Sequence, residues 1–80
     1  MQDVDILRHI EELVNEEHAL TKQSQAGGLD DAEHARMRQL EVSLDQCWDL
    51  LRQRRALRSA HLNPEEARVR DADIVEHYKQ

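Results

Sequence analysis

The sequence predicts an all-α fold, in which an antiparallel helical hairpin is followed by a short C-terminal helical tail. Apolar residues recur at intervals of three and four along two long segments, which is the spacing of amphipathic helices. The only two glycines, Gly27 and Gly28, separate these segments, and the only proline, Pro64, follows the second one. A connection this short makes two helices antiparallel neighbours. We therefore expect one helical domain over residues 1–80.

The first helix is expected over about residues 4–23. Asp3 or Asp5 can cap it, because a side-chain oxygen there satisfies free backbone N–H groups. Its apolar face consists of Ile6, Leu7, Ile10, Leu13, Val14 and Leu20, and Glu17 interrupts that stripe. A turn over residues 24–29 should end the helix, because glycines adopt the backbone conformations that stop a helix and reverse the chain.

The second helix is longer and is expected over about residues 31–59. Asp30 and Glu33 stand three residues apart, as in a capping box. The apolar seam has coiled-coil spacing and consists of Met37, Leu40, Leu44, Cys47 and Leu51. Its next two positions are Arg54 and Arg58. The two helices should span roughly 29 Å and roughly 43 Å, so the arginine-rich end of the second helix overhangs the first.

The remaining chain predicts a short helical tail over residues 64–79. Asn63 and Pro64 suit the start of a helix that runs to about Arg68. Asp71 is placed to cap a final turn that carries Ile74, Val75 and Tyr78. So short a helix is unstable alone. We expect the tail to dock on the overhang, on its own hairpin or on a partner chain.

Composition narrows the class of protein. The chain has 80 residues and one cysteine, so an intrachain disulfide is excluded and a reducing compartment fits. Its formal net charge of −6 argues against a general binder of nucleic acids or anionic membranes. The acidic N-terminus is not followed by an apolar run, so we expect no secretory signal and no membrane span. The expected location is cytoplasmic.

A two-helix hairpin has one contact face per helix and cannot enclose a core. Chains of this size bury a small fraction of their surface and usually gain stability from a metal, disulfides or a partner. The simplest assembly is a homodimer in which two hairpins form a four-helix bundle. The alternative is a three-helix monomer closed by the tail.

The candidate interaction residues are Arg52, Arg54, Arg55, Arg58, Trp48 and Tyr78. The arginines can form an ion-pair network, with Asp45 and Asp49 a turn away and the glutamates of the first helix opposite. They can also bind phosphate or nucleic acid, or an acidic protein partner. Trp48 suits a core or interface anchor. Cys47 lies on the apolar seam, which favours a buried thiol over a reactive one.

Metal and catalytic chemistry are not favoured. Helical carboxylate sites use Glu-x-x-His pairs, and no glutamate precedes a histidine by three residues. The five histidines, His9, His18, His34, His61 and His77, are interpreted as surface residues. We expect no cofactor, no metal and no catalytic residue. A non-enzymatic protein-interaction or structural module is the leading hypothesis, and a nucleic-acid-associated factor acting through residues 52–58 is the alternative.

The run Leu-Asp-Gln-Cys-Trp-Asp-Leu-Leu-Arg-Gln-Arg-Arg-Ala at residues 44–56 resembles the signature of a small actinobacterial family of uncharacterised proteins, a domain of unknown function about 80 residues long. The opening residues 5–18 and the closing residues 74–78 also look like that family. The resemblance covers nearly the whole chain. It implies a helical cytoplasmic protein, and it implies no activity, cofactor or functional residue.

Overall fold

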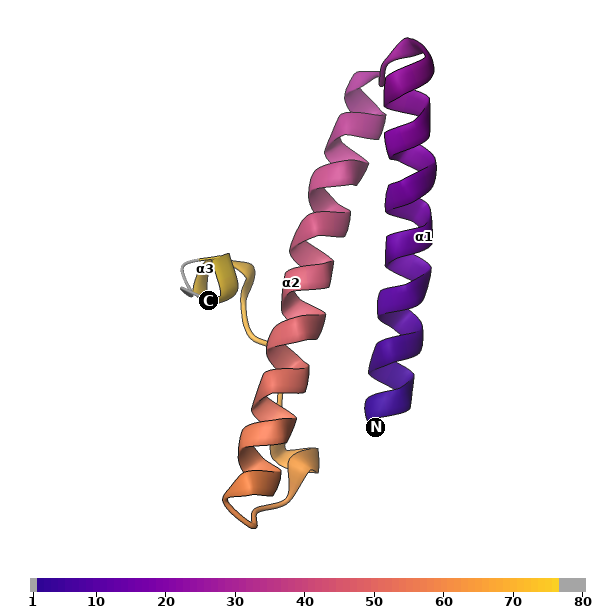
Figure 1. Ribbon diagram of the computed structural model, residues 1–80. Coiled ribbons are helices and arrows are strands. Elements are labelled where there is room, and N and C mark those ends of the chain that lie inside the picture. Colours follow the sequence, from indigo (N-terminus) through magenta and orange to yellow (C-terminus); the bar gives the residue numbers. More distant parts are fainter. Residues whose placement is uncertain (1, 77–80) are drawn as a thin grey trace.

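The computed structural model describes residues 2–76 and places two long helices side by side in opposite directions (Figure 1). They are α1 (Asp3–Gly27) and α2 (Asp31–Ser59). A 3₁₀ turn, η1 (Pro64–Glu66), and a short helix, α3 (Ala72–Glu76), follow. The predicted fold class, an all-α antiparallel hairpin with a short tail, is confirmed.

Helix α1 begins and ends a few residues away from the predicted bounds. Gln2 is the N-cap residue, and its backbone N–H donates to Asp5 Oδ2 at 3.0 Å, so Asp5 acts from the first turn instead of at the cap. The helix continues to Gly27 because residues 24–26 are compatible with helical geometry. Gly28 ends it with a φ of 89°, a conformation that only glycine adopts without strain.

Helix α2 has the predicted start and end. The Glu33 N–H donates to Asp30 Oδ1 at 2.8 Å, and the Asp30 N–H donates to Glu33 Oε1 at 3.1 Å. Both bonds of the capping box are therefore present. At the other end, His61 takes a φ of 60° and the Leu62 N–H donates to the Leu57 carbonyl at 2.8 Å, which turns the chain back along α2.

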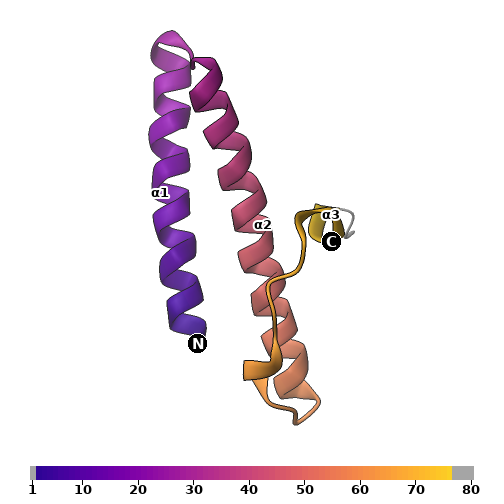
Figure 2. The same ribbon diagram turned by 180° about the vertical axis from the view of Figure 1, so that it is seen from behind.

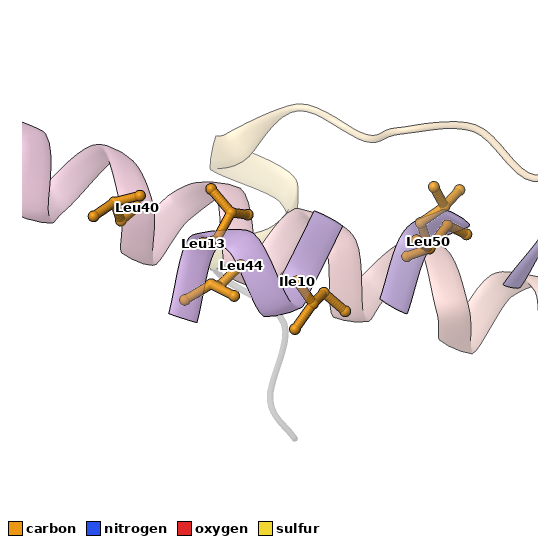
Figure 3. Close-up of a cluster of buried hydrophobic side chains, with 6 residues drawn as sticks. Ile10, Leu13, Leu40, Leu44 and Leu50 are labelled. Atoms are coloured by element: carbon orange, nitrogen blue, oxygen red, sulfur yellow. The ribbon is translucent and has the colours of Figure 1, made fainter. Parts of the chain in front are cut away.

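The core is one row of apolar side chains between the two helices, and Figure 3 shows part of it. Its buried members are Ile6, Ile10 and Leu13 from α1 and Leu40, Leu44 and Leu50 from α2. Cys47 and Leu51 are partly buried against this row, as the seam predicts. Leu50 lies beside the predicted seam and is nevertheless buried. The contact stripe of α2 is thus wider than a strict coiled-coil seam.

The tail is less helical than predicted. The helix expected from Pro64 to about Arg68 is a single 3₁₀ turn, and residues 67–71 are not helical. The chain crosses one face of α2 and places α3 on the side of α2 away from α1 (Figures 1 and 2). Val75 of α3 is 3% exposed. The tail therefore docks on its own α2, which is one of the three sites expected for it.

The molecule is elongated, with a radius of gyration of 14.9 Å and dimensions of 50 × 25 × 18 Å. Within residues 2–76, neither long helix contains a stretch apolar enough to cross a membrane.

Candidate interaction surface

The arginine-rich end of α2 is divided by the fold into an inward group on the side of α1, of which Arg54 is buried and Arg58 is exposed, and an outward group beside Trp48. Arg54 and Arg58 continue the apolar stripe of α2, because they lie seven residues from Cys47 and Leu51. Arg55 lies seven residues from Trp48 and shares the flank of that residue. The cluster seen in the sequence is therefore two separate features of the structure.

The inward group joins three segments of the chain. Arg54 is 5% exposed, and its guanidinium donates to Asp3 Oδ1 at the start of α1. It also donates to the Pro64 carbonyl at 3.2 Å and to Glu65 Oε1 at 3.3 Å, both in η1. Arg58 Nη2 lies 2.9 Å from Asp3 Oδ2. The predicted overhang is thus covered by η1, and Arg54 fixes it there.

The ion-pair interpretation holds for Arg54 and Arg58, but their acidic partner differs from the predicted ones. Hydrogen bonds from Arg54 and then Arg58 lower the pKa of the Asp3 carboxyl. Among the α1 glutamates expected opposite the arginines, Glu16 instead pairs with Arg36, whose Nη2 lies 2.8 Å from Glu16 Oε1. The position of each acidic residue along the hairpin explains the difference. Asp3 lies beside the C-terminal end of α2, whereas Glu16 lies beside the N-terminal part of α2.

The tail is held on α2 by a second ion pair. Asp49 is fully buried at 0% exposure. It accepts from Arg70 Nε at 2.9 Å on one oxygen and from Arg70 Nη2 on the other, a bidentate contact. Gln53 Nε2 donates to the same carboxylate at 2.8 Å. The Arg70 bonds outweigh the effect of burial and lower the pKa of Asp49.

Two glutamines of α2 bind the backbone of the tail. Gln53 Nε2 donates to the Arg68 carbonyl at 2.7 Å, and Gln53 Oε1 accepts from the Arg68 N–H at 3.3 Å. Gln46 Nε2 donates to the Arg70 carbonyl at 3.1 Å. Together with Asp49, these side chains form a polar stripe along α2 at intervals of three and four residues. The stripe satisfies the backbone of a segment that has no helix of its own.

The outward group surrounds the tryptophan. Trp48 is 45% exposed, so its interpretation as a core residue is wrong and its role as an interface anchor stays a prediction. Trp48, Leu51, Arg52 and Arg55 line a shallow hollow of about 360 Å³. Arg52 is the more buried of the two arginines, and its Nη2 lies 3.6 Å from Asp49 Oδ1. Arg55 is exposed. Tyr78, the last predicted interaction residue, lies outside the described residues.

A second hollow lies on the opposite flank of the hairpin, under the tail. It measures about 240 Å³ and is lined mainly by apolar atoms, with Ile6, Cys47, Leu50 and Val69 among its walls. Burial raises the pKa of the Cys47 thiol, which leaves less of the reactive thiolate at neutral pH. Cys47 is partly buried, and so less enclosed than the core cysteine predicted from the seam. Its low reactivity stays a prediction. His9, His18, His34 and His61 are exposed, and His77 lies outside the described residues.

Comparison with known proteins places this architecture in a family. A family model described as a protein of unknown function, DUF2630, matches residues 2–80. The chain belongs to the DUF2630 family. It is also 53% identical over 77 residues to uncharacterised proteins of Mycobacterium bovis and of two strains of Mycobacterium tuberculosis. Each alignment covers 95% of this chain and 88% of the relative. No solved structure matches the chain.

The DUF2630 match includes the hairpin and the tail, so both belong to the family unit. The resemblance noted in the sequence is therefore confirmed at the level of the family.

Three structural contacts of this DUF2630 protein were not predicted from its sequence. The sequence favours the neighbouring arginines of α2 as partners of Asp49, whereas its main partner is Arg70. It suggests Asp3 as a helix cap, whereas Asp3 binds Arg54. The contacts of Gln46 and Gln53 with the tail are the third. A signal was available for the last group, because Gln46, Asp49 and Gln53 repeat at helical spacing on a flank that the apolar seam does not use.

Proposed function

We propose that this DUF2630 protein is a non-enzymatic, cytoplasmic protein-interaction module that works as a homodimer of two packed hairpins. The observation that carries the proposal is the single row of core residues combined with a tryptophan left 45% exposed. A large aromatic side chain at the surface is typical of the centre of a protein interface. The proposal assigns Trp48 to that role.

The shape of the chain supports a partner. A compact domain of this length has a radius of gyration of about 12 Å, whereas this hairpin has 14.9 Å. The difference arises because the helices lie in one layer, with the tail covering part of one face of α2. Packing a second layer on the opposite face gives both hairpins the enclosed core of a four-helix bundle.

The non-enzymatic assignment rests on the character of the hollows under the tail and beside Trp48. A third hollow of about 520 Å³, along α2 from Ala35 to Ser43, is a wide surface depression. A catalytic pocket needs convergent polar groups, often with a pKa shifted toward the working pH. The hollow under the tail is mainly apolar, and the pKa of its thiol is shifted away from reactivity. The hollow at Trp48 is shallow and bordered by guanidinium groups. Both suit packing against another surface better than chemistry on a small substrate.

Sedimentation equilibrium tests the proposal. The chain has a mass of 9.4 kDa, and we expect a concentration-dependent shift to twice that mass with a dissociation constant of about 10 µM or below. Circular dichroism on the same samples monitors helicity. A helical protein that stays monomeric up to about 1 mM would contradict the homodimer.

A nucleic-acid-associated role is the second candidate, and one observation favours it. Trp48 is exposed beside Arg52 and Arg55, and an aromatic ring flanked by guanidinium groups can stack with and hold single-stranded nucleic acid. Against it, Arg54 and Arg58 are paired with Asp3, and the chain has a net charge of −6. Fluorescence anisotropy with a labelled single-stranded oligonucleotide at low salt tests this role. We expect no binding, and salt-sensitive binding lost in Arg55→Ala would establish the candidate.

A further inference from the structure

Leu7 and Trp48 share the flank of the hairpin that faces away from the tail. The hollow under the tail is lined by Asp5 and His9 of α1 and by Gln46 and Leu50 of α2. Leu7 lies two residues from Asp5 and two from His9. Trp48 lies two residues from Gln46 and two from Leu50. Two residues turn a helix by roughly 200°. Leu7 and Trp48 therefore project from the opposite face of their helices.

These two residues also lie at the same level along the hairpin. Asp3 contacts Arg54 near one end, and Glu16 contacts Arg36 further along. Leu7 stands between these two levels on α1, which places it beside the Trp48 turn of α2. Leu7 is 49% exposed and Trp48 is 45% exposed. We call the surface formed by Leu7, Val14, Trp48, Leu51 and Arg55 the Trp48 face.

The described part of the tail, up to residue 76, leaves this face uncovered. Figure 2 shows the extended segment of the tail crossing in front of α2, and Figure 1 shows the same hairpin from the other side, where the tail does not cross it. The uncovered side is long enough for a stable contact. A helix of 25 residues spans about 37 Å. Two helices whose axes lie about 9 Å apart, each about 10 Å wide, give a face about 19 Å across and about 700 Å² in area, close to the roughly 800 Å² that each partner buries in a standard interface.

Charge selects how a second copy meets this face. Helix α1 carries six acidic and two basic side chains, a net charge of −4, and α2 carries five acidic and six basic side chains, a net charge of +1. A twofold axis perpendicular to the helices would stack α1 on α1 and bring the acidic helices together. A twofold axis along the helices places each α1 against the α2 of the other copy. The second arrangement instead places the acidic α1 against α2, whose Arg52 and Arg55 border Trp48.

We propose that the Trp48 face is the self-association surface of this protein, with α1 of each copy packed antiparallel on α2 of the other. The proposal rests on the proposed homodimer and names its surface and its symmetry. Because Leu7 and Trp48 lie at one level, the twofold axis along the helices brings Trp48 onto Leu7 of the partner subunit. Leu7 then forms the floor on which the indole packs, Val14 continues the apolar contact two turns along α1, and Arg55 borders the contact.

Sedimentation of matched variants tests the surface. Trp48→Ala and Leu7→Ala each remove an apolar side chain twice in a symmetric dimer, so each should raise the dimer dissociation constant at least about a hundredfold. Val69→Ala removes an apolar side chain that is 63% exposed on the tail side. It should leave the constant within about twofold. All three positions are exposed enough that circular dichroism should show unchanged helicity.

Disulfide trapping tests the symmetry. In a Cys47→Ser background, Leu7→Cys protein is mixed with Trp48→Cys protein and oxidised mildly. A covalent heterodimer should form in the mixture and exceed the homodimers formed by either variant alone, because the proposed axis brings position 7 of one copy to position 48 of the other. The mixture cannot form this bond within one chain.

The outcomes separate this inference from the proposed function. A dimer that is weakened by Val69→Ala and unaffected by Trp48→Ala overturns the Trp48 face and leaves the homodimer standing. If Trp48→Ala weakens the dimer but the mixture of cysteine variants traps no covalent heterodimer, the proposed axis is overturned. A monomer at every concentration overturns the homodimer itself, and the inference with it.

Discussion

Breaking the ion pair that fixes the tail gives the sharpest test of how this fold is held together. Arg70→Ala removes two hydrogen bonds from Asp49, which is fully buried, and leaves that carboxylate with Gln53 and with Arg52 Nη2 at 3.6 Å. Removing one partner of a buried pair costs about 3–5 kcal/mol. Because 34% of the Arg70 side chain is exposed, water can enter in its place. We therefore expect a loss at the lower end, about 3 kcal/mol.

The second variant isolates the charge as the cause. Asp49→Asn added to Arg70→Ala removes the carboxylate that has lost its bidentate partner and keeps the shape of the side chain. The double variant should be about 1–2 kcal/mol more stable than Arg70→Ala, since a buried neutral amide costs less than a buried charge that has lost its strongest partner. Arg36→Ala breaks an ion pair whose side chains are 46% and 42% exposed, and it should lower stability much less.

The assay is urea unfolding followed by circular dichroism, at one protein concentration and at pH 7, because dimerisation would couple stability to concentration. Hydrogen exchange of the Ile74 and Val75 amides, which both donate to the Asp71 carbonyl, reports whether the tail opens separately. The reasoning would be refuted if Arg70→Ala were as stable as the wild type. It would also be refuted if adding Asp49→Asn made the Arg70→Ala variant less stable, because the buried charge of Asp49 would then not be the cause of the loss.

Three further changes have expected outcomes. Because the pKa of Asp49 is lowered in the folded state, the ionised carboxylate stabilises the fold above about pH 4, and this contribution is lost as the pH falls through the folded pKa. In an acid denaturation series, the difference in stability between the wild type and Asp49→Asn should therefore narrow. Gly28→Ala should destabilise by about 1–3 kcal/mol in urea unfolding because its φ is 89°, whereas Gly27→Ala, within the helix, should be neutral or slightly stabilising. Cys47 should react with a thiol reagent at pH 8 more slowly in the folded protein than in urea, because burial raises the pKa of its thiol.

The hairpin was predictable because its signals are local. The apolar spacing, the capping box of Asp30 and Glu33 and the paired glycines each depend on residues a few positions apart. The fold satisfies them with one exception, because Leu7 was predicted on the apolar face of the first helix and is 49% exposed. The predicted end of α1 is too early because the prediction treats residues 24–29 as one turn. Only Gly28 departs from the right-handed region of backbone conformations, so the preceding residues remain helical.

The contacts of the tail were not predictable in the same way. Asp49 and Arg70 are 21 residues apart, and Asp3 and Arg54 are 51 residues apart. Each basic residue had acidic neighbours much closer in sequence, so spacing favoured local pairs. Burial decided the outcome, since a fully buried carboxylate requires a bidentate partner, and Arg70 supplies one. The sequence pattern contains the residues but does not rank the partners.

Helical phase, rather than the density of arginines, determines which residues remain available for an interface. Arg54 and Arg55 are adjacent, yet about 100° separates them around α2. That rotation places Arg54 on the stripe that ends at Asp3, where it is 5% exposed, and Arg55 on the flank of Trp48, where it is exposed. A cluster of four arginines in the sequence thus leaves two at the surface hollow, beside one exposed tryptophan. The Trp48 ring with its narrow basic border suits a protein surface of opposite charge better than it suits a polyanion. A polyanion would need the arginines that the fold uses to hold α1 and the tail together.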